Sequence, residues 1–417
     1  MIFIINALKI IFVLGFLVLI HEAGHFFVAR LCKVTVNEFS IGFGPVIWKK
    51  QGKQTKYSLR LIPLGGFVNL EGEEEHSTKE GSFSEASIPK RMAIIVAGAS
   101  VNIIFAIIIY FTLTLCTGNN TSLIVKETIN DYAAQNAGIQ AEDEIIKINN
   151  KRVHTKKDID KIMQNYNKEE LELTVKRNNN EINVLLTPTK QEYKSTGIYL
   201  KSSGESTKII TIEPGSNAEK QGIKANDEIL KINQKEVKNQ NEIIEEINKE
   251  ENETLDFTLK RGNEEINIKV EPDKKYNYYL GIYFKQAENN FSNNLYYAFF
   301  ETKDFLFSIF ENLKMLFTGK VKIDQFMGPV GISEVVVKTN KIQDYIYILA
   351  LISLSLGVTN LLPIPALDGG KFLLLIIEAI RGKKISEKVE INIQLAGFAL
   401  LIALSIYVTY NDILRIL

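Results

Sequence analysis

The sequence predicts a polytopic α-helical membrane protein with four transmembrane helices, a cytoplasmic re-entrant β-hairpin or loop, and two tandem domains of mixed α+β structure. Four apolar runs have the length of a helix that crosses a bilayer, which needs about 20 residues. Between the second and third runs, a polar segment repeats at a gapless offset of 84 residues, too long for a solenoid. The average composition hides both features, since 46% hydrophobic residues and zero net charge are typical of a soluble globular protein.

The apolar runs are the candidate spans. They are Ile2–Ile20, Met92–Leu115, Tyr345–Pro365 and Ile393–Tyr410. The first run could instead be a cleaved signal peptide, but it continues directly into His21 and Glu22 without a small-residue cleavage site. The apolar stretch within 371–381 is too short to span, so it is expected to lie at the interface or to pack as a short helix.

Lysine and arginine residues beside the spans predict the orientation. The segments 29–91 and 371–390 are rich in both residues, and such segments stay on the cytoplasmic side. The chain ends and the long segment between the second and third spans then lie outside, because domains of that size translocate largely regardless of charge. The net charge of zero also argues against a nucleic-acid partner, which would need a basic surface.

The repeated segment predicts two small domains with one fold. Ala134–Val153 and Ala218–Val237 are identical at 12 of 20 positions, and the same offset pairs Gly197-Ile198-Tyr199 with Gly281-Ile282-Tyr283. The shared pattern A-x-x-x-G-I-x-x-x-D-x-I-x-x-I-N resembles PDZ domains of the bacterial protease type. The resemblance implies domains that bind an extended peptide at a sheet edge. A pair of β-rich spacers without a ligand is the alternative.

His21-Glu22-Ala23-Gly24-His25 forms an H-E-x-x-H motif. In a helix, positions i and i+4 share one face, so both imidazoles can reach one metal ion, while Glu22 lies about 100° round the helix and can act on a metal-bound water. A catalytic zinc site uses three protein ligands and a water. A solvated polar face is the alternative, but ionisable residues within a span are costly and functional by default. The motif therefore predicts a zinc site at the inner end of the first span.

The third ligand is expected to be an acidic residue or a histidine in another span. His76 and His154 occur in polar, loop-like contexts, and Glu378 falls in the short cytoplasmic stretch. Asp368 is therefore the best candidate.

Asp368 follows a proline-rich end of the third span. Pro363 and Pro365 interrupt helical hydrogen bonding, and Gly369-Gly370 permits close backbone approach. Broken helix at membrane depth is tolerated only where it lines a buried or wet cavity, which favours a site. The alternative is a simple turn that leaves the span.

H-E-x-G-H in the first span and N-x-x-P-x-P-x-L-D-G in a later one together resemble the site-2 protease family of intramembrane zinc metalloproteases. Two PDZ-type domains between the second and third spans are similar to its regulator of sigma-E protease branch. The resemblance implies that His21, His25 and Asp368 bind one Zn²⁺ per chain. It also implies that Glu22 is the general base and that Asn360 helps to hold the substrate strand.

Further segments agree with this family. They are Gly42-Phe43-Gly44-Pro45, Ile62-Pro63-Leu64-Gly65-Gly66-Phe67-Val68, Gly98 with Asn102, and Gly328-Pro329-Val330-Gly331-Ile332. One departure is Ala99, where the family often has proline. That departure leaves the local helix shape near Asn102 open.

The segments Ile41–Pro45 and Lys56–Leu70 are rich in glycine, aromatic and β-branched residues, which predicts a re-entrant β-hairpin or loop. Its edge could hold an unwound substrate as an added strand. The expected substrate contacts are Asn360, Gly42, Gly44, Gly65, Gly66 and Asn102. An ordinary cytoplasmic hairpin is the alternative, and Asn102 could equally make only an interhelical hydrogen bond in lipid.

The family resemblance implies an endopeptidase of regulated intramembrane proteolysis. Its substrates would be single-pass transmembrane proteins, such as an anti-sigma factor or a remnant signal peptide, after a site-1 protease has removed the outer domain. The PDZ pair would filter substrates by size or bind the new C-terminus. The enzyme would span the bacterial cytoplasmic (inner) membrane, with its PDZ domains on the periplasmic side and its active site near the cytoplasmic side.

Two other functions are compatible with parts of the sequence. One is a membrane scaffold without protease activity, in which zinc is structural and the PDZ domains recruit outer proteins. The other is a metal-ion transporter, although four spans with one ligand cluster offer no repeated halves for alternating access.

The predicted organisation alternates spans with polar segments. It is a first span at 1–28, a cytoplasmic or re-entrant β region at 29–91, a second span at 92–116, PDZ domains at 117–202 and 203–288, an amphipathic linker helix with the G-P-V-G-I segment at 289–342, a third span at 343–370, a cytoplasmic segment at 371–390 and a fourth span at 391–417. The linker helix, expected within 289–317, would lie on the outer membrane surface or pack between domains.

Overall fold

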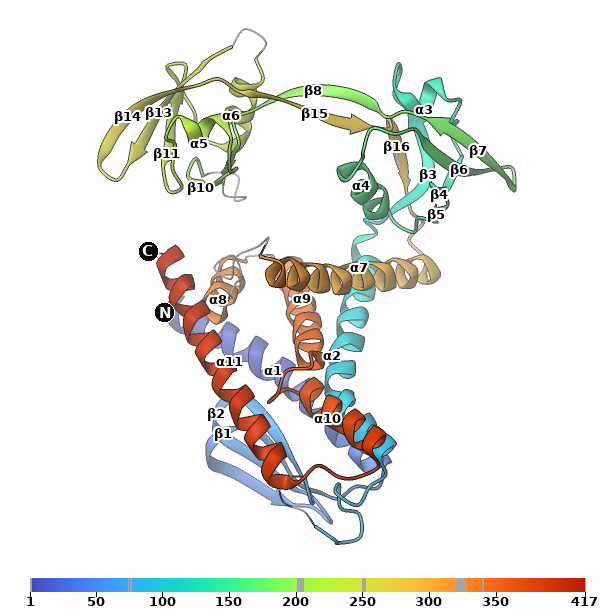
Figure 1. Cartoon of the computed structure of the whole chain (residues 1–417), viewed down its shortest axis with the longest axis vertical. Helices are drawn as coiled ribbons and strands as arrows, with labels where there is room; N and C mark the ends of the chain where they lie inside the picture. The colour runs from blue at the N-terminus through green and yellow to red at the C-terminus, as the bar shows by residue number, and fades with distance from the viewer. Residues whose placement is uncertain are drawn as a thin grey trace. The chain divides into compact units, whose positions relative to one another are not determined.

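The computed structural model describes residues 2–73, 75, 77–200, 206–249, 253–319, 328–339 and 341–416. The chain forms two compact units, one made of Met1–Asn120 with Ala287–Leu417 and the other of Thr121–Gln286 (Figure 1). The first unit contains the long helices, and the second contains most of the strands. His76, a residue predicted to lie in a polar loop, falls outside the described residues.

Four helices of the first unit are long and apolar enough to cross a membrane. They are α1 (Ile2–Leu31), α2 (Ile88–Thr117), α9 (Ile342–Leu361) and α11 (Glu387–Ile416). In an apolar medium a helix is favoured because it satisfies its backbone polar groups within the segment. The four predicted spans are thus confirmed as candidates by length and composition.

α2 packs closely against both α1 and α9. A Cβ on Gly24 of α1 would come within 2.7 Å of the carbonyl oxygen of Ala97, and a Cβ on Gly357 of α9 within 2.9 Å of that of Ala99. Small residues at such crossings let helix backbones approach, which is how helices associate in lipid. α2 also runs unbroken through Ala99. The helix is therefore continuous at the position where the family often has proline.

The described residues of this unit also form three shorter or less apolar helices. They are α7 (Phe291–Phe317), α8 (Pro329–Lys338) and α10 (Asp368–Arg381). α7 lies within the predicted linker helix and buries Ala298 and Thr302, while Phe291, Phe299 and Phe310 are exposed. α10 has 14 residues and is the short helix predicted for this stretch. Contact of α7 with a membrane surface stays a prediction.

The first unit also contains one sheet, formed by β1 (Val36–Gln51) and β2 (Lys56–Leu70). The sheet folds back on itself, because the segment 38–41 faces both 66–69 and 56–59. Gly42 and Gly44 have φ of +86° and +85°, a conformation that glycine adopts without steric cost. They allow β1 to bend between its two halves, and the predicted hairpin is present.

β2 packs against the apolar part of α1. A Cβ on Gly15 would come within 2.5 Å of the carbonyl oxygen of Pro63, so the two backbones touch shortly before His21. Large apolar side chains of this sheet are exposed, namely Phe43, Ile47, Trp48, Leu61 and Ile62. Exposed apolar side chains in such number are unusual for a sheet in water.

The second unit contains two copies of one small α+β fold. The first copy consists of β3 (Thr121–Thr128), α3 (Ala133–Asn136), β4 (Glu144–Ile148), β5 (Lys151–Arg152), α4 (Lys156–Gln164), β6 (Leu171–Arg177), β7 (Asn180–Leu186) and β16 (Ile282–Gln286). The second consists of β9 (Ile198–Leu200), β10 (Ile209–Ile212), α5 (Asn217–Lys220), β11 (Glu228–Ile232), β12 (Lys235–Glu236), α6 (Gln240–Ile247), β13 (Leu255–Arg261) and β14 (Glu264–Val270). Equivalent residues form the two cores, such as Ile145 and Ile229.

The strand pairing nests the second copy inside the first. β16 pairs with β3 and so joins the sheet of the first copy, whereas its repeat equivalent β9 pairs with β10 in the second copy. The chain enters and leaves the second copy through β8 (Thr189–Ser195) and β15 (Asp273–Tyr279), which pair along their whole length (Figure 1). This arrangement departs from the tandem order predicted with a boundary between 202 and 203. The repeat offset identifies equivalent residues, but non-local contacts decide which strand pairs with which.

Each copy holds a buried aspartate against an arginine at the same repeat position. Arg177 donates two hydrogen bonds to Asp143 (2.7 and 2.6 Å), and Arg261 donates two to Asp227 (2.8 and 2.7 Å). Burial alone would raise the pKa of both carboxyls, but the arginine hydrogen bonds and a backbone N–H lower the pKa overall. Both ionised aspartates therefore stabilise their copy.

Neutralising either aspartate is expected to destabilise its copy. Asp227→Asn removes the carboxylate from Arg261, and we expect a loss of about 2 kcal/mol in the free energy of unfolding. Because the folded-state pKa of Asp227 is lowered below the unfolded value of about 3.9, this contribution is present above about pH 4 and is lost as the pH falls through the folded-state pKa. Thermal unfolding of the native and Asp227→Asn chains across acidic and neutral pH measures it. A difference that persists undiminished at the lowest pH contradicts this explanation.

Candidate metal centre

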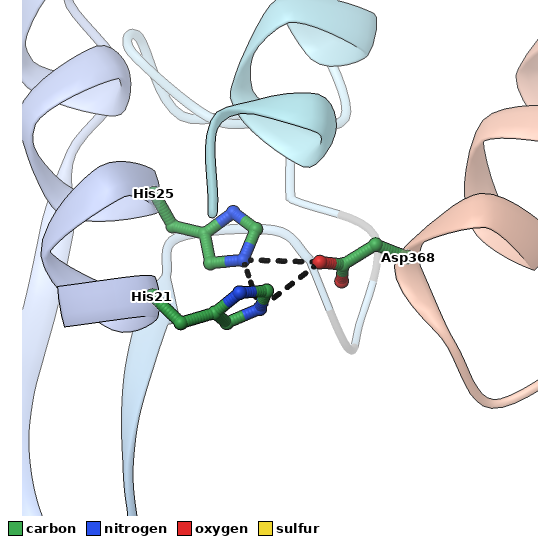
Figure 2. Close-up of side chains that lie close together, drawn as sticks. All are labelled: His21, His25 and Asp368. Atoms are coloured by element: carbon green, nitrogen blue, oxygen red, sulfur yellow. Dashed lines mark hydrogen bonds and ion pairs between the residues drawn. The ribbon is translucent and has the colours of Figure 1, made fainter. Parts of the chain in front are cut away.

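His21 and His25 lie one turn apart on α1, and Asp368 faces them from the first turn of α10 (Figure 2). The Nε2 atoms of the two histidines are 3.2 Å apart. The Oδ2 atom of Asp368 is 3.1 Å from Nε2 of His21 and 3.3 Å from Nε2 of His25. The three side chains are 9%, 14% and 19% exposed. The structure thus brings the three predicted ligands together in one cluster, in which His21 is buried and His25 and Asp368 are partly buried.

The three atoms form a triangle that fits a tetrahedral zinc ion. Ligand atoms about 2.0–2.1 Å from zinc lie about 3.3 Å apart at the tetrahedral angle, and the observed separations are 3.1, 3.2 and 3.3 Å. Two imidazole nitrogens and a carboxylate oxygen are a donor set that zinc accepts. Three protein ligands leave the fourth position for water or substrate.

The second nitrogen of each imidazole has a partner on α2. His25 Nδ1 donates to the carbonyl oxygen of Ile94 (2.8 Å). His21 Nδ1 lies 3.4 Å from the side-chain amide of Asn102, which is fully buried. The atom of Asn102 that faces His21 is the amide nitrogen Nδ2, while its amide oxygen has no hydrogen-bond partner. A metal on Nε2 would leave the proton on Nδ1, and turning the amide by about 180° would present the oxygen to accept that proton. These contacts direct both Nε2 atoms toward Asp368 and place Asn102 in an interhelical hydrogen bond.

Gly98 of α2 lies against the imidazoles themselves. A Cβ at this position would come within 2.4 Å of His25 Nε2 and 2.7 Å of His21 Cε1. No side chain fits there without moving a ligand. The residue type at position 98 is therefore dictated by the two histidines.

A tight loop between α9 and α10 positions Asp368. A Cβ at Gly369 would come within 2.2 Å of the carbonyl oxygen of Leu362, and one at Gly370 within 2.3 Å of that of Ile364. The prediction that this glycine pair permits close backbone approach is confirmed.

Ala366 adds strain to the same loop. Its φ is +72°, a left-handed conformation that costs a residue with a Cβ on the order of 1 kcal/mol. The backbone N–H of Ala366 donates to Oε1 of Gln394 on α11 (2.5 Å). The last span thereby holds the loop in its strained conformation.

Two other predicted residues lie beside the ligands. Glu22 follows His21 on α1 and is close enough to interact electrostatically with His25, His21 and Asp368. Asn360 is in the last turn of α9 and is half-buried. Within the described part of the chain, its side-chain amide makes no hydrogen bond, and substrate contact at Asn360 stays a prediction.

The predicted glycines of β2 have structural reasons of their own. Gly65 has a φ of +94°, and a Cβ there would come within 2.6 Å of the Phe43 ring. A Cβ on Gly66 would come within 2.5 Å of the carbonyl oxygen of Ser40. Packing within the sheet accounts for both glycines, and substrate contact at these positions stays a prediction, as it does at the bend glycines of β1.

Two polar contacts around the site were not predicted from the sequence. One is the hydrogen bond from Ala366 to Gln394, and the other is a buried ion pair between Arg91 and Glu378. Gln394 is a polar side chain within the fourth apolar run, and Arg91 directly precedes the second run. Polar residues at such positions are signals of buried partners.

Comparison with known proteins identifies the family. The model of peptidase family M50 matches residues 9–404. The chain belongs to peptidase family M50. This M50 chain is 29% identical to the regulator of sigma E protease of Haemophilus influenzae, over 97% of this chain and 98% of that protein. It is 27% identical to the zinc metalloprotease RasP of Shouchella clausii, over 98% and 99%.

The site-2 protease resemblance and the zinc metalloprotease class predicted from the motifs are thereby confirmed. Among solved structures, the HtrA3 PDZ domain bound to a phage-derived ligand matches 21% of the M50 chain and 93% of its own, at 18% identity and a TM-score of 0.19. This likeness is too small to identify the fold of either copy of the repeat, and the PDZ assignment stays a prediction.

Gly98→Ala is expected to weaken metal binding in this M50 protein without breaking α2. The added methyl group overlaps His25 Nε2, so we expect zinc affinity to fall at least 100-fold, beyond the 10–100-fold cost of a lost supporting contact. Competition with a chromophoric chelator measures the affinity. Ala93→Val adds volume at an exposed position of the same helix and should leave the affinity unchanged. Native affinity in Gly98→Ala contradicts the arrangement described here.

Proposed function

We propose that the chain is an intramembrane zinc endopeptidase that performs site-2 cleavage, the hydrolysis of peptide bonds within transmembrane segments. The single observation that supports this most is the triangle of His21, His25 and Asp368, built between apolar helices. His21 and His25 lie in α1, a helix long and apolar enough to span a bilayer, and Asp368 begins the shorter helix α10, which follows another such helix, α9. Ligand groups in such helices are expensive and mark function.

One Zn²⁺ per chain would be held by His21, His25 and Asp368. When bound, zinc would lower the pKa of its water toward 7 and polarise the scissile carbonyl. The names of the relatives support zinc, since one of them is a zinc metalloprotease. His25 and His21 would keep their Nδ1 protons on Ile94 and Asn102 throughout.

Glu22 would be the general base. It lies on the same helix as the two histidines and interacts electrostatically with all three ligands. Its carboxylate would take the proton from the attacking water and then pass it to the leaving amine. This role needs a carboxylate that does not itself bind the metal, and the cluster of three ligand atoms includes no atom of Glu22.

The substrate would be held as a strand. A transmembrane helix hides its carbonyls in its own hydrogen bonds, so the scissile segment must unwind before it can be attacked. The sheet of β1 and β2 touches α1 at Gly15, within the apolar part of the helix, and it exposes the apolar side chains that a re-entrant element needs. An added strand at its edge would supply backbone hydrogen bonds, and the side-chain amide of Asn360 would hold the same segment.

Substrates would be single-pass proteins related to an anti-sigma factor, or remnant signal peptides, first shortened by a site-1 protease. The name of one relative, regulator of sigma E protease, supports this pathway. The protein would lie in the bacterial inner membrane with its active site near the cytoplasmic face, and the Thr121–Gln286 unit would lie outside.

The second copy of the repeat would be the receptor or filter of this outer unit. A groove of about 180 Å³ lies between β9 and α6, lined by Ile198, Leu200, Ile243, Ile244 and Ile247 among others. The equivalent of Ile244 in the first copy is Asp160, which pairs with Lys156 (2.8 Å). The second copy is therefore the better fit to the apolar C-terminus of a trimmed substrate.

Glu22→Gln is expected to keep zinc and abolish cleavage. The amide cannot accept the proton from water, and general acid–base catalysis contributes about 10²–10⁴-fold, so cleavage of a reconstituted transmembrane substrate should fall by at least about 10²-fold. Chelator competition should give native zinc affinity. A Glu22→Gln protein that cuts at the native rate refutes this mechanism, and native cellular function without cleavage would support a scaffold instead.

Removal of the substrate's outer domain is expected to be required for cleavage. A matched pair of transmembrane substrates, with and without a folded outer domain, should differ in kcat/KM with the native protease. Ile244→Asp places the first copy's side chain in the groove of the second copy. If that groove binds the trimmed terminus, the variant should raise KM for the short substrate. If only size is filtered, Ile244→Asp should leave both substrates unchanged.

A further inference from the structure

The buried ion pair between Arg91 and Glu378 joins the two halves of the metal centre. Arg91 donates from Nη1 to Oε2 (3.1 Å) and from Nη2 to Oε1 (2.5 Å), a bidentate pair whose side chains are 9% and 11% exposed. Nε of Arg91 also donates to the carbonyl oxygen of Ala86 (3.1 Å). The guanidinium of Arg91 on α2 is therefore fixed in orientation, and it binds the carboxylate of Glu378 on α10.

α2, which carries Arg91, supports the two histidines. The carbonyl of Ile94 holds His25, the amide of Asn102 holds His21, and Gly98 lies against both rings. These groups lie within the first turns that follow Arg91. A shift of α2 would thus move the supports of both imidazoles.

α10, which carries Glu378, begins with the third ligand. Asp368, Lys371, Leu375 and Glu378 follow one another at intervals of three or four residues, so they form one stripe along the helix. Leu375 and Glu378 are buried. The rotation and tilt of this 14-residue helix therefore set where the Asp368 carboxylate lies.

Because the ion pair between Arg91 and Glu378 is buried, a contribution to the stability of the fold does not explain its presence well. Removing two charges from water costs about as much as their attraction returns, and apolar replacements of such pairs are often neutral or stabilising. A bidentate arginine–carboxylate contact does, however, fix distance and angle. Geometry is then what the pair contributes.

We propose that Arg91 and Glu378 are positioning residues that hold α10 at the distance from α2 at which Asp368 completes the metal site. This inference rests on the proposed metal role of Asp368. The segments beside these two helices offer a control, because Lys384, just after α10, contacts Glu85, just before α2 (3.2 Å), with both side chains about half exposed. Exposed pairs of this kind contribute little.

The test compares zinc affinity with stability in the full-length protein. In Arg91→Met/Glu378→Met the apolar pair should keep the thermal midpoint of the native chain, while zinc affinity, measured by chelator competition with the metal alone, should fall at least about tenfold. Arg91→Lys keeps the charge but loses the bidentate geometry, so it should also bind zinc more weakly at native stability. Lys384→Met/Glu85→Met should match the native chain in both measurements.

Native zinc affinity in the folded double variant, or in Arg91→Lys if the double variant does not fold, overturns the proposal. A loss of affinity matched by an equal loss in the Lys384→Met/Glu85→Met control overturns it as well. Failure of the proposed function is distinguishable, because it would appear in the native chain itself, which would then bind no zinc or would bind zinc without cleaving the transmembrane substrate.

Discussion

The close approach of α1 and α2 is the constraint on which the rest of the structure depends. Three ligand atoms must lie within about 3.3 Å of one another for one tetrahedral ion to hold them. His21 and His25 supply two of these atoms from α1 and Asp368 supplies the third from α10. Gly24 and Gly98 leave no side chain between α1 and α2, so α2 does not push either imidazole out of place. Once the backbones touch, α2 can also offer a carbonyl and an amide to the rear nitrogens of both rings. A single methyl group in this contact would separate the groups that make up the centre.

The site also shows how polar groups are accommodated among apolar helices. Buried polar atoms are costly unless they are paired, and here each imidazole has one nitrogen facing the metal position and one facing α2. The strained backbone at Ala366 is compensated by Gln394 from the last span. Strain of this kind persists only where the surroundings over-determine it. The last span is thus part of the centre although it supplies no ligand.

The sequence was sufficient for features that are local or chemical. Helical spacing puts His21 and His25 on one face, and the proline and glycine residues around Asp368 mark a broken helix. The sequence could therefore single out these three residues as candidate ligands, and the structure brings them together. The nested order of the repeats could not, because β9 and β16 are equivalent in sequence and differ only in their distant partners. Arg91 and Glu378 are 287 positions apart, and nothing local to either one reveals the other.

The second copy is attached to the first through the paired strands β8 and β15, so it can be regarded as an inserted module. Its two ends leave side by side along one ladder, which is the geometry that tolerates insertion, removal or exchange of a whole domain. The first copy keeps β16 paired with β3 in its own sheet, whatever is carried beyond the ladder. Related chains can therefore vary, lose or replace the second copy in one genetic step. Neither the first copy nor the first unit would have to be rebuilt.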